Sequence, residues 1–232
     1  MGQSDAILAG GGDELCFESF YGFERAELLC GSNHRHGDFP IPLDIRRNGF
    51  ALGEGAALLM LEDAGCARRR GAKVLARLRG RGITYDPTRG TDQRESVEAI
   101  ARAMRLAVDD AAISSDDIHF VSLSANGSIR LDRHEAQAVA TFFKRPSQSV
   151  PVTAVKSALG ETLGASGALQ TVALVESMRT GVLPGIAGLE ELDPQCPLVS
   201  ASARSRELKA SAGIMNSVGL DGNCCSIVVS RC

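Results

Sequence analysis

From residue 73 onward, segments with strand character and segments with helix character alternate in a regular order, and this alternation limits the fold more than any other feature. Short segments rich in Val, Ile and Leu are typical of buried strands, and the longer segments between them carry apolar residues at helical spacing. The predicted order is βαβαβαββ, with strands at 73–82, 118–123, 150–155, 213–218 and 226–230 and helices at 93–111, 132–143 and 165–181. This order predicts an α/β fold in which helices cover a mixed, mostly parallel sheet.

The first part of the chain has less regular order. Residues 5–12 form an apolar run that ends in glycines, which predicts a buried strand followed by a tight turn. A loop rich in Gly, Asn, His and Pro is expected at 31–48, and a second buried strand in the latter part of 49–62. A short helix at 64–70 is expected to end at Gly71.

Composition excludes several classes of function. Hydrophobic residues make up 44%, charged residues 23% and the net charge is -3, which fits a globular protein without a basic face for nucleic acid. The longest apolar run, residues 56–61, is too short to span a membrane. The seven cysteines are irregularly spaced and form no CxxC pair, so neither a disulfide framework nor a zinc site is predicted. We interpret them as reduced, mostly buried thiols of a cytoplasmic protein, and expect no metal or other cofactor.

Four motifs resemble those of one enzyme family. They are RNGFALGEGAA at 47–57, similar to "DGFVLGEGAG"; DRHEAQA at 132–138, similar to "DxxEAQA"; KSALGETLGASGA at 156–168, similar to "KSxxGHxxGAAGA"; and NSVGLDGN at 216–223, similar to "NSFGFGGTN". These motifs are found in the β-ketoacyl-acyl-carrier-protein synthases, the condensing enzymes of fatty acid and polyketide synthesis. Their order and separations also fit, and the resemblance covers essentially the whole chain.

The resemblance implies a thiolase-like fold of two pseudo-symmetric βαβαβαββ halves. Residues 1–63 would be the incomplete tail of the N-terminal half, and residues 64–232 the C-terminal half. In the family, the nucleophilic cysteine lies on a helix before the strand that Asp5 opens here, and none of the seven cysteines stands at its position. Condensation needs that thiolate to carry the acyl chain, and it needs donors that stabilise the charge formed on decarboxylation.

Two family histidines supply that stabilisation, and both are replaced here. The first belongs to an "HGTxT" segment; an alignment without gaps places Ser124 at its position, and a shifted alignment places Ala125 or Asn126 there. The second follows the family lysine by five residues, where this chain has Glu161. An ionised carboxylate repels a developing enolate instead of stabilising it.

The family lysine and glutamate are retained as Lys156 and Glu135. One interpretation is an altered active site in which Lys156 pairs with Glu161 or Glu135. The other is a buried ion pair that holds two segments in register without chemistry. We favour the second, because neither retained residue replaces a lost histidine.

Three further positions are predicted, by resemblance, to bind substrate: Leu220, Asn126 and Asn216. Leu220 replaces a phenylalanine that gates the acyl pocket in the family, and core packing is an equally good interpretation of it. The nearby His119 and His134 are interpreted as ordinary polar positions.

The resemblance therefore implies a non-condensing homologue, similar to the chain length factors that pair with an active ketosynthase in type II polyketide and aryl-polyene systems. One alternative is an active 3-oxoacyl synthase, which requires a cysteine from an N-terminal half and a protonated Glu161. Another is a fragment that only oligomerises through an uncovered apolar face. The expected partners are an acyl carrier protein and either an active ketosynthase subunit or a second copy of the chain, with neither nucleic acid nor membrane.

Overall fold

A computed structural model describes residues 4–31, 39–143 and 150–232, so part of the loop expected at 31–48 lies outside the described residues. The strands are β1 (Ala6–Asp13), β2 (Gly55–Glu62), β3 (Arg77–Tyr85), β4 (Val121–Ser122), β5 (Val152–Thr153), β6 (Val182–Leu183), β7 (Arg206–Glu207), β8 (Ala212–Val218) and β9 (Asn223–Ser230). The helices are α1 (Phe17–Arg25), α2 (Ala64–Arg69), α3 (Gln93–Asp110), α4 (Ile129–Phe142), α5 (Lys156–Leu159) and α6 (Ser166–Thr180), with short 3-10 helices η1 (Ser115–Asp117) and η3 (Leu163–Ala165).

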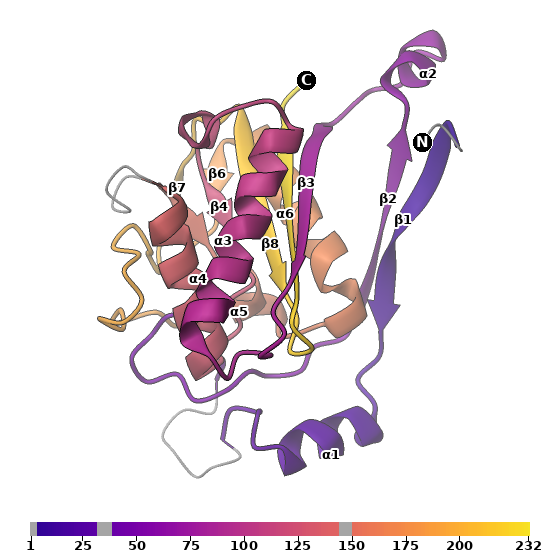
Figure 1. The fold of residues 1–232 in the computed structure, drawn as a ribbon. Helices are drawn as coiled ribbons and strands as arrows, with labels where there is room; N and C mark the ends of the chain where they lie inside the picture. Colours follow the sequence, from indigo (N-terminus) through magenta and orange to yellow (C-terminus); the bar gives the residue numbers. More distant parts are fainter. Residues whose placement is uncertain (1–3, 32–38, 144–149) are drawn as a thin grey trace.

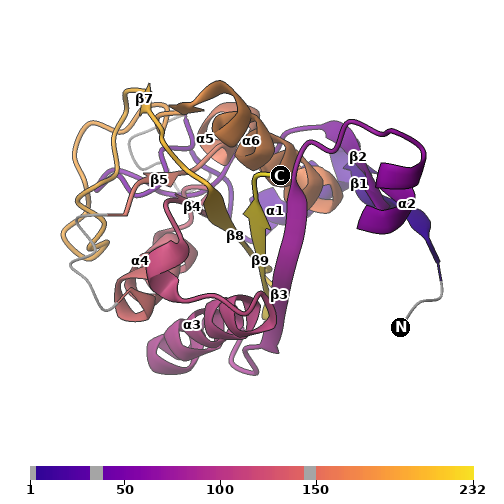
Figure 2. The ribbon, with the colours of Figure 1, turned by 90° about the horizontal axis from the view of Figure 1, so that it is seen from above.

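The central sheet has five strands in the order β3-β9-β8-β4-β5 (Figure 1 and Figure 2). Strand β9 pairs antiparallel with both β3 and β8, whereas β4 pairs parallel with β8 and with β5. Four strands therefore run in one direction and only β9 runs in the other. The expected mixed, mostly parallel sheet is confirmed, as is the βαβαβαββ order of its main elements.

Helices cover both faces of this sheet: α3 and α4 lie on one face and α6 on the other (Figure 2). Alternate residues of the strands serve the two faces, as the pleat requires. Val121 and Ile214 pack in the core cluster that includes Met104 of α3. On the opposite face, Phe120 and Met215 pack in the cluster that includes residues of α6.

Strand β3 differs from the prediction in both position and inward face. The alternation at 73–82 predicts Val74, Ala76 and Leu78 as inward residues, yet the strand begins at Arg77 and Leu78 is 51% exposed. The buried positions of β3 are Gly80, Gly82 and Thr84. Helix α3 lies so close that a Cβ on Gly82 would come within 2.0 Å of the Ala103 carbonyl oxygen. Only glycine fits such an approach, so hydrophobicity alone gives the wrong face.

Strands β1 and β2 form a separate antiparallel ribbon, and the expectation that both are buried is wrong (Figure 1). The glycines of β1 continue the strand to Asp13 instead of making a tight turn. On one face of the ribbon, Leu8, Leu58 and Met60 are each about 60% exposed. The other face packs partly on α6 and η3. The described elements thus leave one apolar face of the ribbon uncovered.

Two smaller expectations also need correction. Strands β4 and β5 each have two residues, where six were predicted at 118–123 and 150–155, because regular pairing is confined to the centre of each segment. The cysteines are not mostly buried: only Cys196 and Cys224 are, and Cys232 is exposed. Among the described residues, no helix is long and apolar enough to cross a membrane.

Candidate functional site

Four of the predicted site residues meet beyond the carboxyl ends of the parallel strands β4 and β5. Ser124 and Asn126 lie in the loop that follows β4, and Lys156 begins α5, which follows β5. Glu161 lies between α5 and η3. Because β4 and β5 run parallel, their carboxyl ends deliver these side chains to one edge of the sheet, the place where open α/β sheets usually hold their sites.

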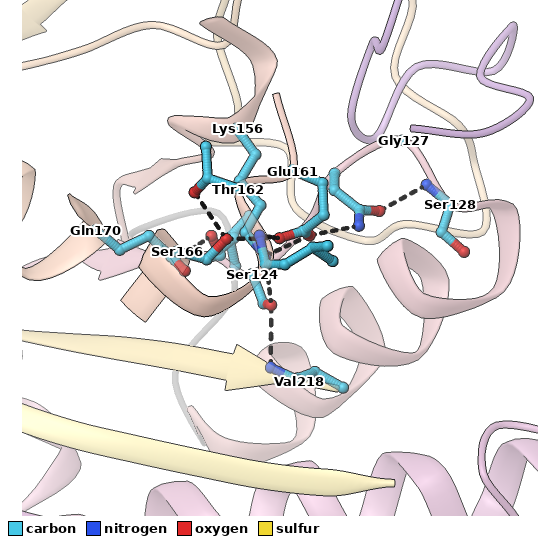
Figure 3. A network of polar contacts seen from close by, with 12 residues as sticks. Ser124, Gly127, Ser128, Lys156, Glu161, Thr162, Ser166, Gln170 and Val218 are labelled. Carbon is cyan, nitrogen blue, oxygen red and sulfur yellow. Dashed lines mark hydrogen bonds and ion pairs between the residues drawn. The ribbon is translucent and has the colours of Figure 1, made fainter. Parts of the chain in front are cut away.

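The carboxylate of Glu161 is the centre of a buried polar cluster (Figure 3). Its Oε2 accepts hydrogen bonds from Lys156 Nζ at 2.7 Å and from Asn126 Nδ2 at 2.8 Å. Its Oε1 accepts from Ser166 Oγ at 2.5 Å and from the Leu163 N–H at 3.1 Å. We call Glu161, Lys156, Asn126 and Ser166 the Glu161 cluster.

These contacts keep Glu161 ionised. Burial by itself raises the pKa of this carboxyl group, but the Lys156 ammonium and the hydrogen bonds from Ser166 and Asn126 outweigh burial and lower the pKa below its ordinary value. Glu161 is therefore a carboxylate at neutral pH. A charged acceptor whose lone pairs already have donors can neither donate a proton to a substrate nor stabilise an oxyanion.

The backbone of Glu161 also joins two distant segments. Its N–H donates to the Ala51 carbonyl oxygen at 2.7 Å, and its carbonyl oxygen accepts from the Gly53 N–H at 3.0 Å. This segment leads directly into β2. The main chain and the side chain of one residue thus tie the approach to the ribbon to the site.

Asp132, from the "DxxEAQA" motif, positions the loop that carries Asn126. The Asp132 carboxylate is fully buried and accepts hydrogen bonds from the backbone N–H groups of Asn126 and Gly127 and, across the chain, of Leu43. Gly127 has φ +103° and a Cβ there would come within 2.4 Å of the Gly49 carbonyl oxygen. The tight loop therefore depends on a glycine and a buried carboxylate.

Glu135 does not pair with Lys156 by a hydrogen bond. Its Oε1 accepts instead from the Ser124 N–H at 2.9 Å and from Asn216 Nδ2 at 3.0 Å. Complete burial raises the pKa of Glu135 to about 7, since these hydrogen bonds only partly offset the loss of water. Of the two partners predicted for Lys156, the structure selects Glu161.

Ser124 connects these groups to the end of β8. Its Oγ accepts a hydrogen bond from the Val218 N–H at 3.0 Å and lies 3.5 Å from Lys156 Nζ (Figure 3). A serine beside a lysine can form a nucleophile and base pair. Here Lys156 donates to a carboxylate and the serine oxygen serves as an acceptor, so this pair is not arranged for nucleophilic attack.

Asn216 and Leu220 occupy different environments. Asn216 is fully buried in β8, where its amide nitrogen donates to Glu135 and its oxygen accepts from Ser226 Oγ at 2.8 Å. Leu220, in the turn between β8 and β9, is 38% exposed. Leu220 lines a pocket of about 420 Å³ together with Arg89, Ser128 and residues of the 27–28 and 48–49 segments.

Sequence reasoning missed two hydroxyl groups of the site. Ser166 begins α6 and donates directly to Glu161, and Thr162 Oγ1 lies 3.1 Å from Ser166 Oγ. Because Ser166 uses its proton on the carboxylate, Thr162 is the donor in that second contact. The sequence does carry a signal for Ser166: it replaces an alanine of "KSxxGHxxGAAGA", in the same motif that carries Glu161.

Other reactive groups of the chain are poorly suited to chemistry here. Burial raises the pKa of Cys196 and of Cys224 to about 12, which disfavours their thiolates. Burial lowers the pKa of His134, which keeps its imidazole neutral. Within residues 4–31, 39–143 and 150–232, no group of three or more His, Cys, Asp and Glu side chains is placed to hold a metal ion.

Two family models match the chain. "Beta-ketoacyl synthase, C-terminal domain" matches residues 75–190, and "Beta-ketoacyl synthase, N-terminal domain" matches residues 1–66. The tetracenomycin polyketide synthase ketoacyl synthase alpha subunit of Streptomyces glaucescens is 30% identical over 231 residues, a match that covers 99% of this chain and 54% of the relative.

Solved structures agree with this similarity. The ishigamide ketosynthase/chain length factor superimposes with a TM-score of 0.89 at 31% identity, covering 100% of this chain and 55% of that one. The AntDE:AntF complex, a type II polyketide synthase acyl-carrier protein with its ketosynthase bound to the hexaketide, gives a TM-score of 0.93 at 26% identity, covering 100% and 57%. The chain spans about half the length of the proteins that it matches.

Proposed function

The chain belongs to the beta-ketoacyl synthase family, and from that premise we propose that it is a non-condensing member that acts, like a chain length factor, as the partner of an active ketosynthase in polyketide or fatty acid synthesis. The observation that carries this proposal is the ionised Glu161, which stands where a condensing enzyme of the family has its second histidine.

The charge at this position opposes condensation. Decarboxylation of a malonyl-type thioester forms an enolate, and catalysis requires preorganised donors aimed at that negative charge. Glu161 is an anion, and the donors around it are already directed to its own oxygens. Ser124, at the position of the first histidine, carries a hydroxyl in place of an imidazole, and its oxygen accepts a hydrogen bond from β8.

A condensing enzyme is the alternative that the retained family residues favour, since Lys156 and Glu135 are both in place and one relative is named as an alpha subunit. That function requires Glu161 to be protonated so that it can donate. Lys156 at 2.7 Å stabilises the opposite, ionised form of Glu161. The geometry therefore favours the non-condensing function.

The proposal extends to partners and organisation. We propose an acyl carrier protein and a ketosynthase subunit as partners, because solved relatives include a carrier protein complex and a ketosynthase/chain length factor. The uncovered apolar face of the β1–β2 ribbon is consistent with association. Residues 1–63 would belong to an N-terminal half and residues 64–232 to a C-terminal half, in a protein of the cytoplasm.

Release of labelled carbon dioxide from malonyl-carrier protein tests the chemistry directly, because decarboxylation needs the anion-stabilising groups but no acyl transfer to a thiol. We expect the purified chain to release none above background and to form no acyl-enzyme detectable by intact mass. An active ketosynthase, measured in parallel, provides the positive control. Sustained turnover by this chain alone would contradict the proposal.

Co-expression with an active ketosynthase tests the partner role. We expect the two proteins to purify together and the length distribution of the products to depend on this chain. The matched control is the chain with Leu58→Lys and Met60→Lys on the exposed ribbon face, which should weaken association without touching the Glu161 cluster. Unchanged products in the presence of the chain would count against a chain-length role.

A further inference from the structure

The carboxylate of Glu161 has more donors than an ion pair requires. Each of its oxygens accepts two hydrogen bonds: Oε2 from Lys156 and Asn126, and Oε1 from Ser166 and the Leu163 N–H. An ionised carboxylate offers about four lone-pair sites, so its acceptor capacity is filled.

Two of these donors depart from the family motifs. Ser166 stands at an alanine of "KSxxGHxxGAAGA", and in the alignment without gaps Asn126 stands at the first threonine of "HGTxT". An alanine side chain could make no hydrogen bond with position 161, and asparagine replaces a threonine hydroxyl with an amide donor. Ser166, from the same motif as Glu161, and Asn126, from a separate part of the chain, both contact Glu161 directly.

We propose that Asn126 and Ser166 are positioning residues that hold Glu161 as a fixed, ionised carboxylate, so that the charge at position 161 is a property of four residues and not of Glu161 alone. The proposal goes beyond the proposed function and does not depend on it, because it concerns how this carboxylate is kept charged in the folded chain.

Both positioning residues are themselves fixed. The Asn126 side-chain oxygen accepts from the Ser128 N–H at 3.0 Å, which turns the amide nitrogen toward Glu161. Ser166 is the first residue of α6 and receives a hydrogen bond from Thr162 (Figure 3). A donor with a fixed orientation loses little entropy when it binds the carboxylate, and hydrogen bonds to a charged group are about twice as strong as neutral ones.

The other charged groups near the cluster do not supply this effect. Lys156 on α5 is the cation in contact with Glu161, and the carboxyl groups of Glu135 and Asp132 face the same region from α4. Those two groups accept backbone and amide hydrogen bonds of their own. Neither donates to Glu161, so the side-chain donors that stabilise it are Lys156 and the two positioning residues, beside the Leu163 N–H.

One consequence is that histidine at position 161 alone does not restore a family-like site. A neutral imidazole has a single acceptor nitrogen. In the Glu161→His chain, that nitrogen would face the Lys156 ammonium, the Asn126 amide and the Ser166 hydroxyl. At least two buried donors would lose their partner, and the neighbouring cation would lower the pKa of the imidazole.

The experiment is a titration of the glutamate side-chain carboxyl carbons by NMR on the full chain, with the Glu161 signal assigned by its loss in Glu161→Gln. In the wild type, we expect the Glu161 signal to stay at its ionised position at every pH at which the chain is folded. In the Asn126→Ala, Ser166→Ala double variant, we expect the midpoint to rise so that the Glu161 signal titrates within the pH range in which the chain is folded.

Two further variants separate positioning from structure. Ser177→Ala removes a buried hydroxyl from the same helix, one whose sole hydrogen bond within the described residues goes to the Ala173 carbonyl oxygen, and should leave the Glu161 signal unchanged. Ser166→Thr keeps the hydroxyl and should retain the wild-type signal. If the double variant does not fold, the single variants test the same point, and each is expected to raise the midpoint by less than the double variant would.

A Glu161 signal that stays as insensitive to pH in the variants as in the wild type would overturn the proposal, as would a wild-type Glu161 that titrates at its ordinary pKa. Neither result depends on turnover. Carbon dioxide release by the chain would contradict the proposed function and leave this inference standing, so the two can fail separately.

Discussion

The backbone N–H of Val218 donates a hydrogen bond of 3.0 Å to the side-chain oxygen of Ser124. This contact fixes the end of β8 to the loop after β4, two residues before Leu220. On the far side of the same turn, the Gly222 carbonyl oxygen accepts from the Asp86 N–H at 2.8 Å. The turn that carries Leu220 is thus held at both ends.

Removal of the Ser124 hydroxyl should loosen that turn. In Ser124→Ala, the Val218 amide loses its acceptor, and we expect its hydrogen exchange to accelerate about fivefold, the equivalent of a hydrogen bond worth roughly 1 kcal/mol. Amide exchange followed by NMR measures this. Ser226→Ala, which removes a buried hydroxyl from the neighbouring strand, is the control. Equal acceleration throughout the sheet would mean that Ser124 stabilises the fold generally and not this turn.

The Lys156–Glu161 pair should be costly to break from one side. In Lys156→Met, Glu161 remains as a buried, unpaired carboxylate, and we expect the free energy of unfolding to fall by about 3–5 kcal/mol. The Lys156→Met, Glu161→Leu chain should lose clearly less than the sum of the two single changes. Urea denaturation of all four proteins completes the cycle. Strictly additive losses would show that the two residues do not interact.

An exposed pair provides the comparison. Glu176 and Arg179 form a contact of 2.6 Å on the outer surface of α6, and both side chains are largely exposed. Glu176→Ala should leave the urea midpoint nearly unchanged, because water screens such pairs. A large loss of stability in Lys156→Met beside a negligible one in Glu176→Ala would show that the loss at the Lys156–Glu161 pair comes from its burial.

Glu135 should make stability depend on pH near neutrality. Its pKa is raised from 4.5 to about 7 in the folded chain, so between these values the folded state holds a proton that the unfolded state has released. Its contribution to stability is therefore complete below about pH 4.5 and declines as the pH rises to 7. Glu135→Gln, which keeps the side-chain acceptor, should lose this decline. If the free energy of unfolding depends on pH in the same way in the wild type and in Glu135→Gln between pH 5 and 7, the expectation is contradicted.

Gly82 should tolerate no side chain. A Cβ there would meet the Ala103 carbonyl oxygen at 2.0 Å, so Gly82→Ala must push α3 away from β3. We expect a loss of about 1–3 kcal/mol in the free energy of unfolding. Gly167→Ala, in the first turn of α6 where no atom lies within 4 Å, should be neutral or slightly stabilising. Thermal or urea denaturation distinguishes the two.

The sequence predicts the order of the elements well because burial imposes periodicity. Helix α3 lies within one residue of the predicted bounds, and Ile100 and Met104 are buried on the face that the helical spacing indicates. Strand β3 shows where that reasoning ends. The face of β3 that points inward is set by the close approach of α3. The residues at this approach are glycines, so a search for hydrophobic residues does not find that face.

The sequence identifies most residues of the site, but it does not identify the contacts between them. Ser124, Lys156 and Glu161 were identified by position in the family motifs, and these three do come together. The choice of Glu161 over Glu135 as the partner of Lys156 could not be made, because both lie at suitable motif positions and only the three-dimensional path of the chain separates them. Ser166 was missed because a serine in a small-residue motif resembles a packing position.

The main-chain contacts of Glu161 give the ribbon a mechanical link to the site. Glu161, which carries the buried charge, also forms backbone hydrogen bonds with Ala51 and Gly53, in the segment that leads to β2. Traction on the ribbon by a bound protein would therefore reach the Glu161 main chain through these two hydrogen bonds, in addition to α6 and η3, which pack against the ribbon.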